Sequence, residues 1–217
     1  MVAPTVRDST TAVTLGGTSC VVNKPAGTIE FDKMYLFATT TTGQTVTPPS
    51  PFAGNEVASV TVGVNITRLY EATAGASEPS TYTYGLSTTG NVELMLVTVM
   101  NARVTGSALN VAVSTNSGAS ATTQTCLGVT TDADECLLLA FAGIQAVSDF
   151  TANGGLTEIE DGTFTTVAYD EAPTAGATGD RTFTSTASNI WLTLLAAIEP
   201  EPPINKRRYS LPMLGVG

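Results

Sequence analysis

Apolar and polar residues alternate with a period of two along several stretches of the chain. The pattern is clearest at residues 60–67, 109–113 and 190–198. Successive side chains of a strand point to opposite faces, so this alternation predicts strands that are buried on one side. No window of useful length shows the 3.6-residue period of an amphipathic helix. The pattern therefore predicts an all-β chain with almost no helix.

Other stretches are apolar at nearly every position, which predicts central strands that are covered on both faces. They are residues 34–38, 94–100 and 136–142. Segments rich in Gly, Pro, Ala, Asn and Ser separate the strands and predict turns. The predicted turns are residues 25–27, 48–51, 74–76, 116–118, 153–155 and 175–177.

The chain repeats itself, because residues 69–99 resemble residues 167–198. The alignment pairs Tyr70 with Tyr169, Tyr84 with Phe183, and Asn91 with Asn189. Two halves of about four strands each predict an antiparallel β-sandwich of about eight strands, jelly-roll-like in form. We expect one folded unit, because a four-stranded half would not cover its own apolar runs.

The expected organisation has three parts: an N-terminal arm (residues 1–8), the β-sandwich domain (9–199) and a tail (200–217). The tail begins with Pro200, Pro202 and Pro203, and prolines end a strand and stiffen a linker. A basic and apolar segment follows, which is the composition of a docking peptide. Its candidate docking residues are Lys206, Arg207, Arg208, Tyr209, Leu211, Met213 and Leu214. A frayed terminus is the alternative interpretation.

Charge and composition narrow the classes of function. Charged residues make up 13% of the chain, against about 25% in ordinary globular proteins. The formal net charge is −10, and an acidic surface repels phosphates, so we expect no direct nucleic-acid binding. Up to Pro203 the chain holds six basic and nineteen acidic residues, a net charge of −13. No segment is apolar for the ~20 residues of a membrane span.

The first ten residues carry no apolar stretch of the kind found in a signal peptide. Thr-rich β chains with few charges often work outside cells. A virion protein, made in the host cytoplasm and released by lysis, reconciles the two observations, and a processed mature chain is the alternative. The three cysteines, Cys20, Cys126 and Cys136, are expected to be buried thiols, although Cys126 and Cys136 flank a short connection and pairing between them stays open.

Candidate catalytic and binding residues are few. The sequence has no histidine, which excludes Ser-His-Asp and Cys-His catalysis, and we expect neither an enzyme nor a cofactor. Asp132, Asp134 and Glu135 form an oxygen-rich cluster that is a candidate calcium site, with a solvated loop as the alternative. Trp191, Tyr82 and Tyr84 are candidate glycan contacts, with core packing as the alternative. The glycan contacts would suit a host-surface attachment module.

Several short motifs occur in an order that resembles a family of phage and metagenomic β-sandwich proteins. The family carries patterns such as KPxGTxxGDLLVA, TPPSGW, AYxxxxAGATG and SxxWxxxLLAxxP. The corresponding segments here, spread between Ser9 and Pro200, are residues 24–28, 46–50, 168–179 and 191, with Asp32 opening an apolar strand. Phe31 stands where the family has Gly, and Pro51-Phe52 where it has Gly-Trp.

The resemblance implies a function, because members of this family are typically virion structural proteins and, less often, bacterial surface proteins. It predicts a non-enzymatic component of a tailed-phage virion, such as a capsid decoration, collar or tail accessory protein. The expected partners are other virion proteins and further copies of the chain in a homo-oligomer. A carbohydrate-binding attachment module is the alternative.

Overall fold

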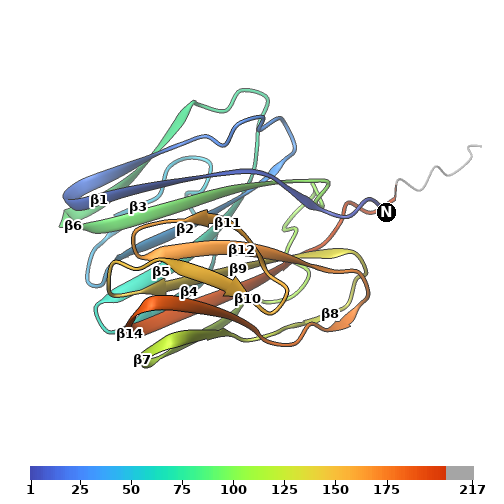
Figure 1. The fold of residues 1–217 in the computed structure, drawn as a ribbon. Coiled ribbons are helices and arrows are strands. Elements are labelled where there is room, and N and C mark those ends of the chain that lie inside the picture. The colour runs from blue at the N-terminus through green and yellow to red at the C-terminus, as the bar shows by residue number, and fades with distance from the viewer. Residues whose placement is uncertain (204–217) are drawn as a thin grey trace, which may run out of the picture.

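The structure is a computed structural model that describes residues 1–203, and its described part consists of two large antiparallel sheets packed face to face (Figure 1). The first sheet has the order β1-β6-β2-β5-β4, with β3 also paired to β6. Its strands are β1 (Thr5–Asn23), β2 (Lys33–Thr41), β3 (Val46–Thr47), β4 (Glu56–Val62), β5 (Asn65–Thr73) and β6 (Thr81–Met100). The antiparallel β-sandwich expected from the sequence is thereby confirmed.

The second sheet has the order β10-β14-β9-β12-β11, with β7 also paired to β14. Its strands are β7 (Ser114–Cys126), β9 (Cys136–Ile144), β10 (Phe150–Asn153), β11 (Thr157–Asp161), β12 (Thr165–Ala172) and β14 (Arg181–Ile198). Two short strands, β8 (Thr130–Thr131) and β13 (Gly176–Ala177), pair with each other beside it. No helix among the described residues is long and apolar enough to cross a membrane.

The two sheets are the two halves of the repeat, and each half forms one sheet. β2, β5 and β6 lie side by side in the first as β9, β12 and β14 do in the second, and a long polar strand, β1 or β7, flanks β6 or β14. Each sheet has six strands rather than four. The additional strands are short or polar and carry a weak apolar signal. β1 begins at Thr5, within the segment that the sequence assigned to an arm.

The sequence alignment of the halves is one residue out of register at β5 and β12. Leu36 on β2 and Leu138 on β9 occupy equivalent positions in the two halves. Leu36 is opposite Tyr70 and Leu138 is opposite Asp170, so Tyr70 corresponds to Asp170. The structural equivalent of Tyr169 is therefore Leu69. A one-residue slip moves a side chain to the other face of a sheet. Tyr70 accordingly lies in an outer cluster, while Tyr169 packs against the central core.

Three apolar clusters stabilise the sandwich. The central core lies between the sheets and includes the stacked rings of Phe37 and Phe141, whose centroids are 4.8 Å apart. The first outer cluster lies on the far face of the first sheet, and the second outer cluster on the far face of the second. Strands β2, β6, β9 and β14 contribute to the central core and to one outer cluster, so their apolar runs are covered on both faces, as expected.

Long strands that bend over the sheets cover the outer faces. β1 is paired with β6 along its whole length, from Thr5 opposite Met100 to Asn23 opposite Thr81. The last residue of β1 also comes back to its first half, because the Thr10 hydroxyl donates to the Asn23 carbonyl at 2.6 Å. The bent β1–β6 ribbon therefore encloses the first outer cluster. β14 bends over the second half in the same way, with register shifts against β7 near Asn189.

Four predictions of local structure are wrong. Residues 175–177 are not simply a turn, because Gly176–Ala177 forms strand β13. Residues 109–113 are not a strand, and only an isolated bridge joins Leu109 to Ile198. Residues 116–118 lie inside β7 and form no turn. The alternation at 60–66 is broken by a hairpin between Val62 and Asn65, where Gly63 has a φ of 54°. A two-residue hairpin loop requires such a conformation.

Candidate interaction site at the tail-bearing end

The chain leaves the described fold at the end of the sandwich where the two halves are joined. The connector (residues 101–113) crosses this end and pairs with the segment after β14 through the bridge Ala102–Pro200. The Glu199 amide donates to the Ala108 carbonyl at 2.8 Å, and the Glu201 amide to the Asn101 carbonyl at 2.9 Å. We call residues 199–203 the tail root. Its backbone is held on the connector, so the direction in which the tail starts is set by the folded body.

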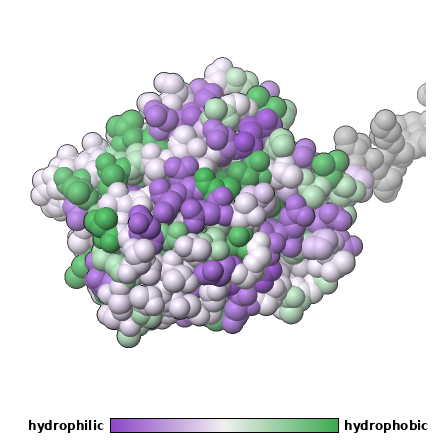
Figure 2. Space-filling view, viewed as in Figure 1, coloured by the Kyte–Doolittle hydropathy of each residue, from purple (hydrophilic) through white to green (hydrophobic). Residues whose placement is uncertain are grey.

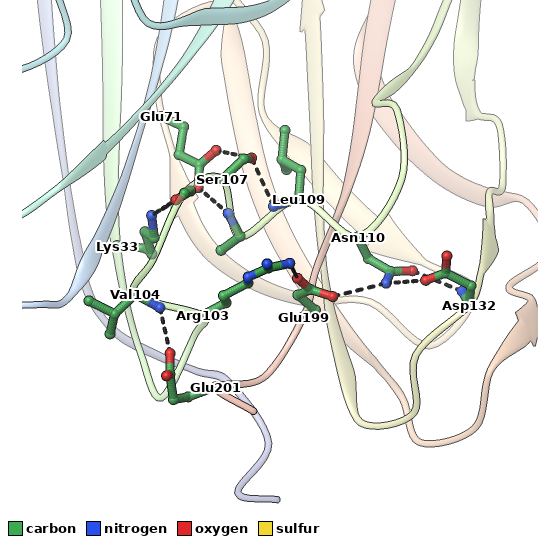
Figure 3. A network of polar contacts seen from close by, with 12 residues as sticks. Lys33, Glu71, Arg103, Val104, Ser107, Leu109, Asn110, Asp132, Glu199 and Glu201 are labelled. Carbon is green, nitrogen blue, oxygen red and sulfur yellow. Dashed lines mark hydrogen bonds and ion pairs between the residues drawn. The ribbon is translucent and has the colours of Figure 1, made fainter. Parts of the chain in front are cut away.

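Side chains reinforce the tail root (Figure 3). Arg103 forms an ion pair with Glu199, and this contact raises the pKa of the guanidinium. A carboxylate oxygen of Glu201 accepts the Val104 amide at 2.6 Å. Each of these bonds joins the root to the connector, and Asn110 extends the network to Asp132. The acidic residues of the root therefore position the backbone.

A buried ion pair fixes the connector to the first sheet. The Lys33 ammonium lies 3.4 Å from the Glu71 carboxylate, and the two side chains are 2% and 6% exposed. Lys33 also donates to the Gly106 carbonyl at 2.6 Å, and Glu71 accepts the Ala108 amide at 2.6 Å. Burial, together with Glu71, raises the pKa of the neighbouring Tyr35 hydroxyl. Removing one partner would leave a buried charge unpaired, which typically costs about 3–5 kcal/mol.

A second buried carboxylate joins the halves at the opposite end. Glu93 on β6 accepts the amides of Thr163 and Phe164, from the turn before β12, and the hydroxyl of Thr165, the first residue of β12. Burial raises the pKa of Glu93, although these hydrogen bonds act in the lowering direction. The sequence analysis missed both Glu93 and the Lys33–Glu71 pair. The available signal was an ionisable residue at the edge of, or inside, an apolar run.

The candidate glycan contacts gain no support from this structure, because the three rings are buried. Tyr84 is 0% exposed, Tyr82 1% and Trp191 9%. Tyr82 and Tyr84 belong to the first outer cluster and Trp191 to the second. The bent ribbons that cover the sheets leave no ring face of these residues open to a sugar. Core packing, the alternative interpretation, explains all three.

The candidate calcium site gains no support from the part of the chain that the structure describes, where no group of three or more acidic, Cys or His side chains is placed to hold a metal. Asp132 accepts the side-chain amide of Asn110, and Asp134 accepts the backbone amide of Ala175. Each carboxylate is hydrogen-bonded to a different neighbouring segment, so the acidic loop holds those two segments in place.

The candidate docking residues Lys206, Arg207, Arg208, Tyr209, Leu211, Met213 and Leu214 lie outside the described residues. All three cysteines are buried free thiols, so Cys126 and Cys136 are not paired. Comparison of the chain with protein-family models, curated proteins and solved structures finds no match. An argument about function therefore has to start from the residues and their geometry.

Proposed function

We propose that the chain is a non-enzymatic structural component of a tailed-phage virion, a capsid decoration, collar or tail accessory protein that acts by protein–protein assembly. The fixed tail root carries this proposal. Backbone and side-chain bonds hold residues 199–201 on the connector, and a basic, apolar segment follows. A rigid body with a docking peptide at a defined place suits repeated assembly better than catalysis.

The residues behind the family resemblance have structural roles, which supports that resemblance. Asp32 accepts two bonds from Arg7 and one from the Ile29 amide. Phe52, where the family has Trp, is fully buried in the first outer cluster. Phe31, where the family has Gly, has a φ of 73°. A bulky residue rarely adopts that conformation, so the position is one that favours Gly.

The surface supports an assembly role as well. Figure 2 shows a face in which polar and weakly polar residues surround small, separate apolar areas. Such a surface resists non-specific association and leaves specific contacts to a few sites. The alternative is a glycan-binding module. Its three candidate rings are buried in the core, and no other observation on the described residues favours it.

Mass spectrometry of purified particles tests the proposal. We expect the chain in many copies per particle, at a fixed ratio to the major capsid or tail protein. A variant truncated after Pro203 retains every described strand, and we expect it to fold normally and to be incorporated at a lower copy number. Absence of the full chain from washed particles would contradict the proposal. Turnover of host capsule or lipopolysaccharide, abolished by a carboxylate substitution, would contradict its non-enzymatic part.

A further inference from the structure

A groove opens between the two sheets on the side where β1 is the edge strand. It is lined by the start of β1 and by β9, β11 and β12. Its apolar lining consists of Val6, Leu137, Ile159 and Tyr169, which all belong to the central core or pack against it. A small apolar area bordered by polar residues is visible in Figure 2 where β1 passes β11 in Figure 1. Here the central core reaches the surface.

The rim of the groove is acidic. Asp8, which also accepts the Ala26 amide at 2.6 Å, and the exposed Glu171 lie on opposite sides of it, and Ser9, which also lines it, binds the carboxylate of Glu160. The cation of the rim, Arg7, is neutralised by a two-bond ion pair with Asp32 at 2.7 and 3.0 Å. The groove thus presents an apolar floor between carboxylates, which suits a ligand with cations beside apolar side chains.

The C-terminal segment of the chain has that chemistry. Lys206, Arg207 and Arg208 precede Tyr209, Leu211, Met213 and Leu214. Nine extended residues, 206–214, span about 30 Å, which is longer than the stretch of β1 that lines the groove, Thr5–Ser9. The basic part can therefore meet the rim while leucine and methionine side chains cover the floor. The body up to Pro203 has a net charge of −13, which attracts such a segment and repels other bodies.

We favour the C-terminal segment of a second copy, over that of the same chain, as the ligand of this groove. The tail root is fixed on the connector, and Pro202-Pro203 then restricts the backbone to extended conformations. A stiff, extended segment at this point disfavours an immediate turn back onto the same body. Contact with a neighbouring body also places cations between two acidic surfaces, which offsets their repulsion.

We propose that residues 206–214 of one copy bind in the β1–β11/β12 groove of a second copy. The inference deepens the proposed function, since it names the partner surface of the assembly contact. Tail and groove are different surfaces, so the contact is heterologous and each copy can both donate and accept. The wild-type chain then forms head-to-tail oligomers whose size rises with concentration.

Complementation between two variants of the full-length chain tests the proposal. The donor variant carries Asp8→Asn and Glu171→Lys, which change the groove and leave the tail intact. The acceptor variant carries Arg207→Glu and Arg208→Glu, which change the tail and leave the groove intact. We expect each variant alone to be monomeric by native mass spectrometry and sedimentation, and their mixture to form a one-to-one dimer. Circular dichroism and thermal unfolding check that both variants are folded.

A labelled peptide of residues 203–217 gives a second readout. We expect it to bind the acceptor variant, and Asp8→Asn with Glu171→Lys on the acceptor background to weaken binding at least about tenfold. Asp149→Lys is the control for Glu171→Lys, since each reverses one carboxylate and changes the net charge by +2. Asp149 is exposed and lies beyond β9, at the opposite end of the second sheet from Glu171. Its reversal should leave affinity within about twofold once general charge effects are screened by salt.

Several results would overturn the inference. A mixture that stays monomeric while the wild type oligomerises would place the tail contact elsewhere. A monomeric wild type, with peptide binding only to the acceptor variant, would show that each groove holds its own tail. Equal weakening by Asp149→Lys would reduce the contact to non-specific charge. If the groove fails these tests while the chain is still found in particles, the proposed function stands and this partner surface does not.

Discussion

The two outer clusters occupy equivalent places in the two halves but are packed differently. The first is rich in large rings and holds Phe52, Tyr70, Tyr82 and Tyr84. The second is rich in small residues and holds Ala140, Ala142, Ala168, Ala172 and Ala197 around Phe150, Phe183 and Trp191. The same strand order therefore tolerates two packing solutions. In one, large rings fill much of the space under the bent ribbon, and in the other alanine side chains take a larger share of it.

The two ways of packing the outer clusters place different requirements on the neighbouring residues. Tyrosine rings bring hydroxyls into the core, and each needs a partner. The Tyr70 and Tyr84 hydroxyls bond each other at 3.1 Å, and the Tyr82 hydroxyl donates to Glu78 at 2.7 Å. Burial raises the pKa of all three, so they stay protonated. The second cluster needs no such network, but the Trp191 ring lies over its cross-strand partner Gly118, where a side chain would not fit.

The largest effect is expected where the halves share a core. Phe37→Ala removes one ring of the Phe37–Phe141 stack and should lower the free energy of unfolding by about 3–5 kcal/mol. Because this ring contacts both sheets, a single cooperative transition should move to lower denaturant concentration. Chemical denaturation monitored by Trp191 fluorescence and by circular dichroism checks this. Two separate transitions in the wild type would show that the halves unfold independently.

A smaller effect is expected from a methyl group in the second cluster. A Cβ at position 118 would lie 2.5 Å from a carbon of the Trp191 ring, so Gly118→Ala should cost about 1–3 kcal/mol. Gly85→Ala is the matched control in the first half, since its Cβ would lie 3.4 Å from Thr47 at the nearest point. Thermal unfolding of both variants gives the comparison. Equal destabilisation would show that the second half is no more closely packed than the first.

In the first cluster the weak point is the hydroxyl network. Tyr84→Phe keeps the ring and removes one hydroxyl, which leaves the Tyr70 hydroxyl without this bond. We expect a loss of about 1 kcal/mol in unfolding free energy, the usual worth of one buried hydrogen bond. Denaturant titration measures it, and Tyr70→Phe with Tyr84→Phe should cost little more than either change alone. Additive losses would contradict a bond between these two hydroxyls.

The smallest effect concerns a carboxylate in the second half. Burial raises the pKa of Asp161 from 3.8 to about 6 in the folded chain. The folded state therefore binds this proton more tightly, and the associated stability is present below pH 3.8 and lost as the pH rises through about 6. Asp161→Asn should remove that loss, so the variant gains at most about 1 kcal/mol on the wild type above pH 6, because solvent screens the group. A stability difference that is constant from pH 4 to 7 would contradict this.

Much of the framework was predictable from the sequence because it depends on burial. Apolar runs identified the strands that are covered on both faces, and the repeat identified the halves. Which segments pair as strands was harder to predict from the sequence. Leu109 and Val113 pack against the central core and Val111 against the second outer cluster, yet the segment pairs with β14 only at its start, near Leu109. Alternation reports which side chains are buried and says nothing of the backbone's hydrogen-bond partners.

The candidate site was less predictable for related reasons. Whether Trp191 and Tyr84 face solvent depends on the bending of β14 and β6, which the local pattern does not encode. The groove joins β1 to β11 and β12, which are more than a hundred residues apart in sequence. The tail root depends on bonds between the connector and the segment after β14. Only the composition of the tail could be read from the sequence directly.

The buried thiols provide each half with its own probe of local opening. Cys20 lies in the first outer cluster, whereas Cys126 and Cys136 lie in the second. Burial raises the pKa of Cys126 to about 12 and of Cys136 to about 11, and it raises that of Cys20 as well. None reacts readily with an alkylating reagent until its cluster opens. The rate at which each thiol is alkylated therefore measures how often its cluster opens to solvent. The measurement uses the wild-type sequence.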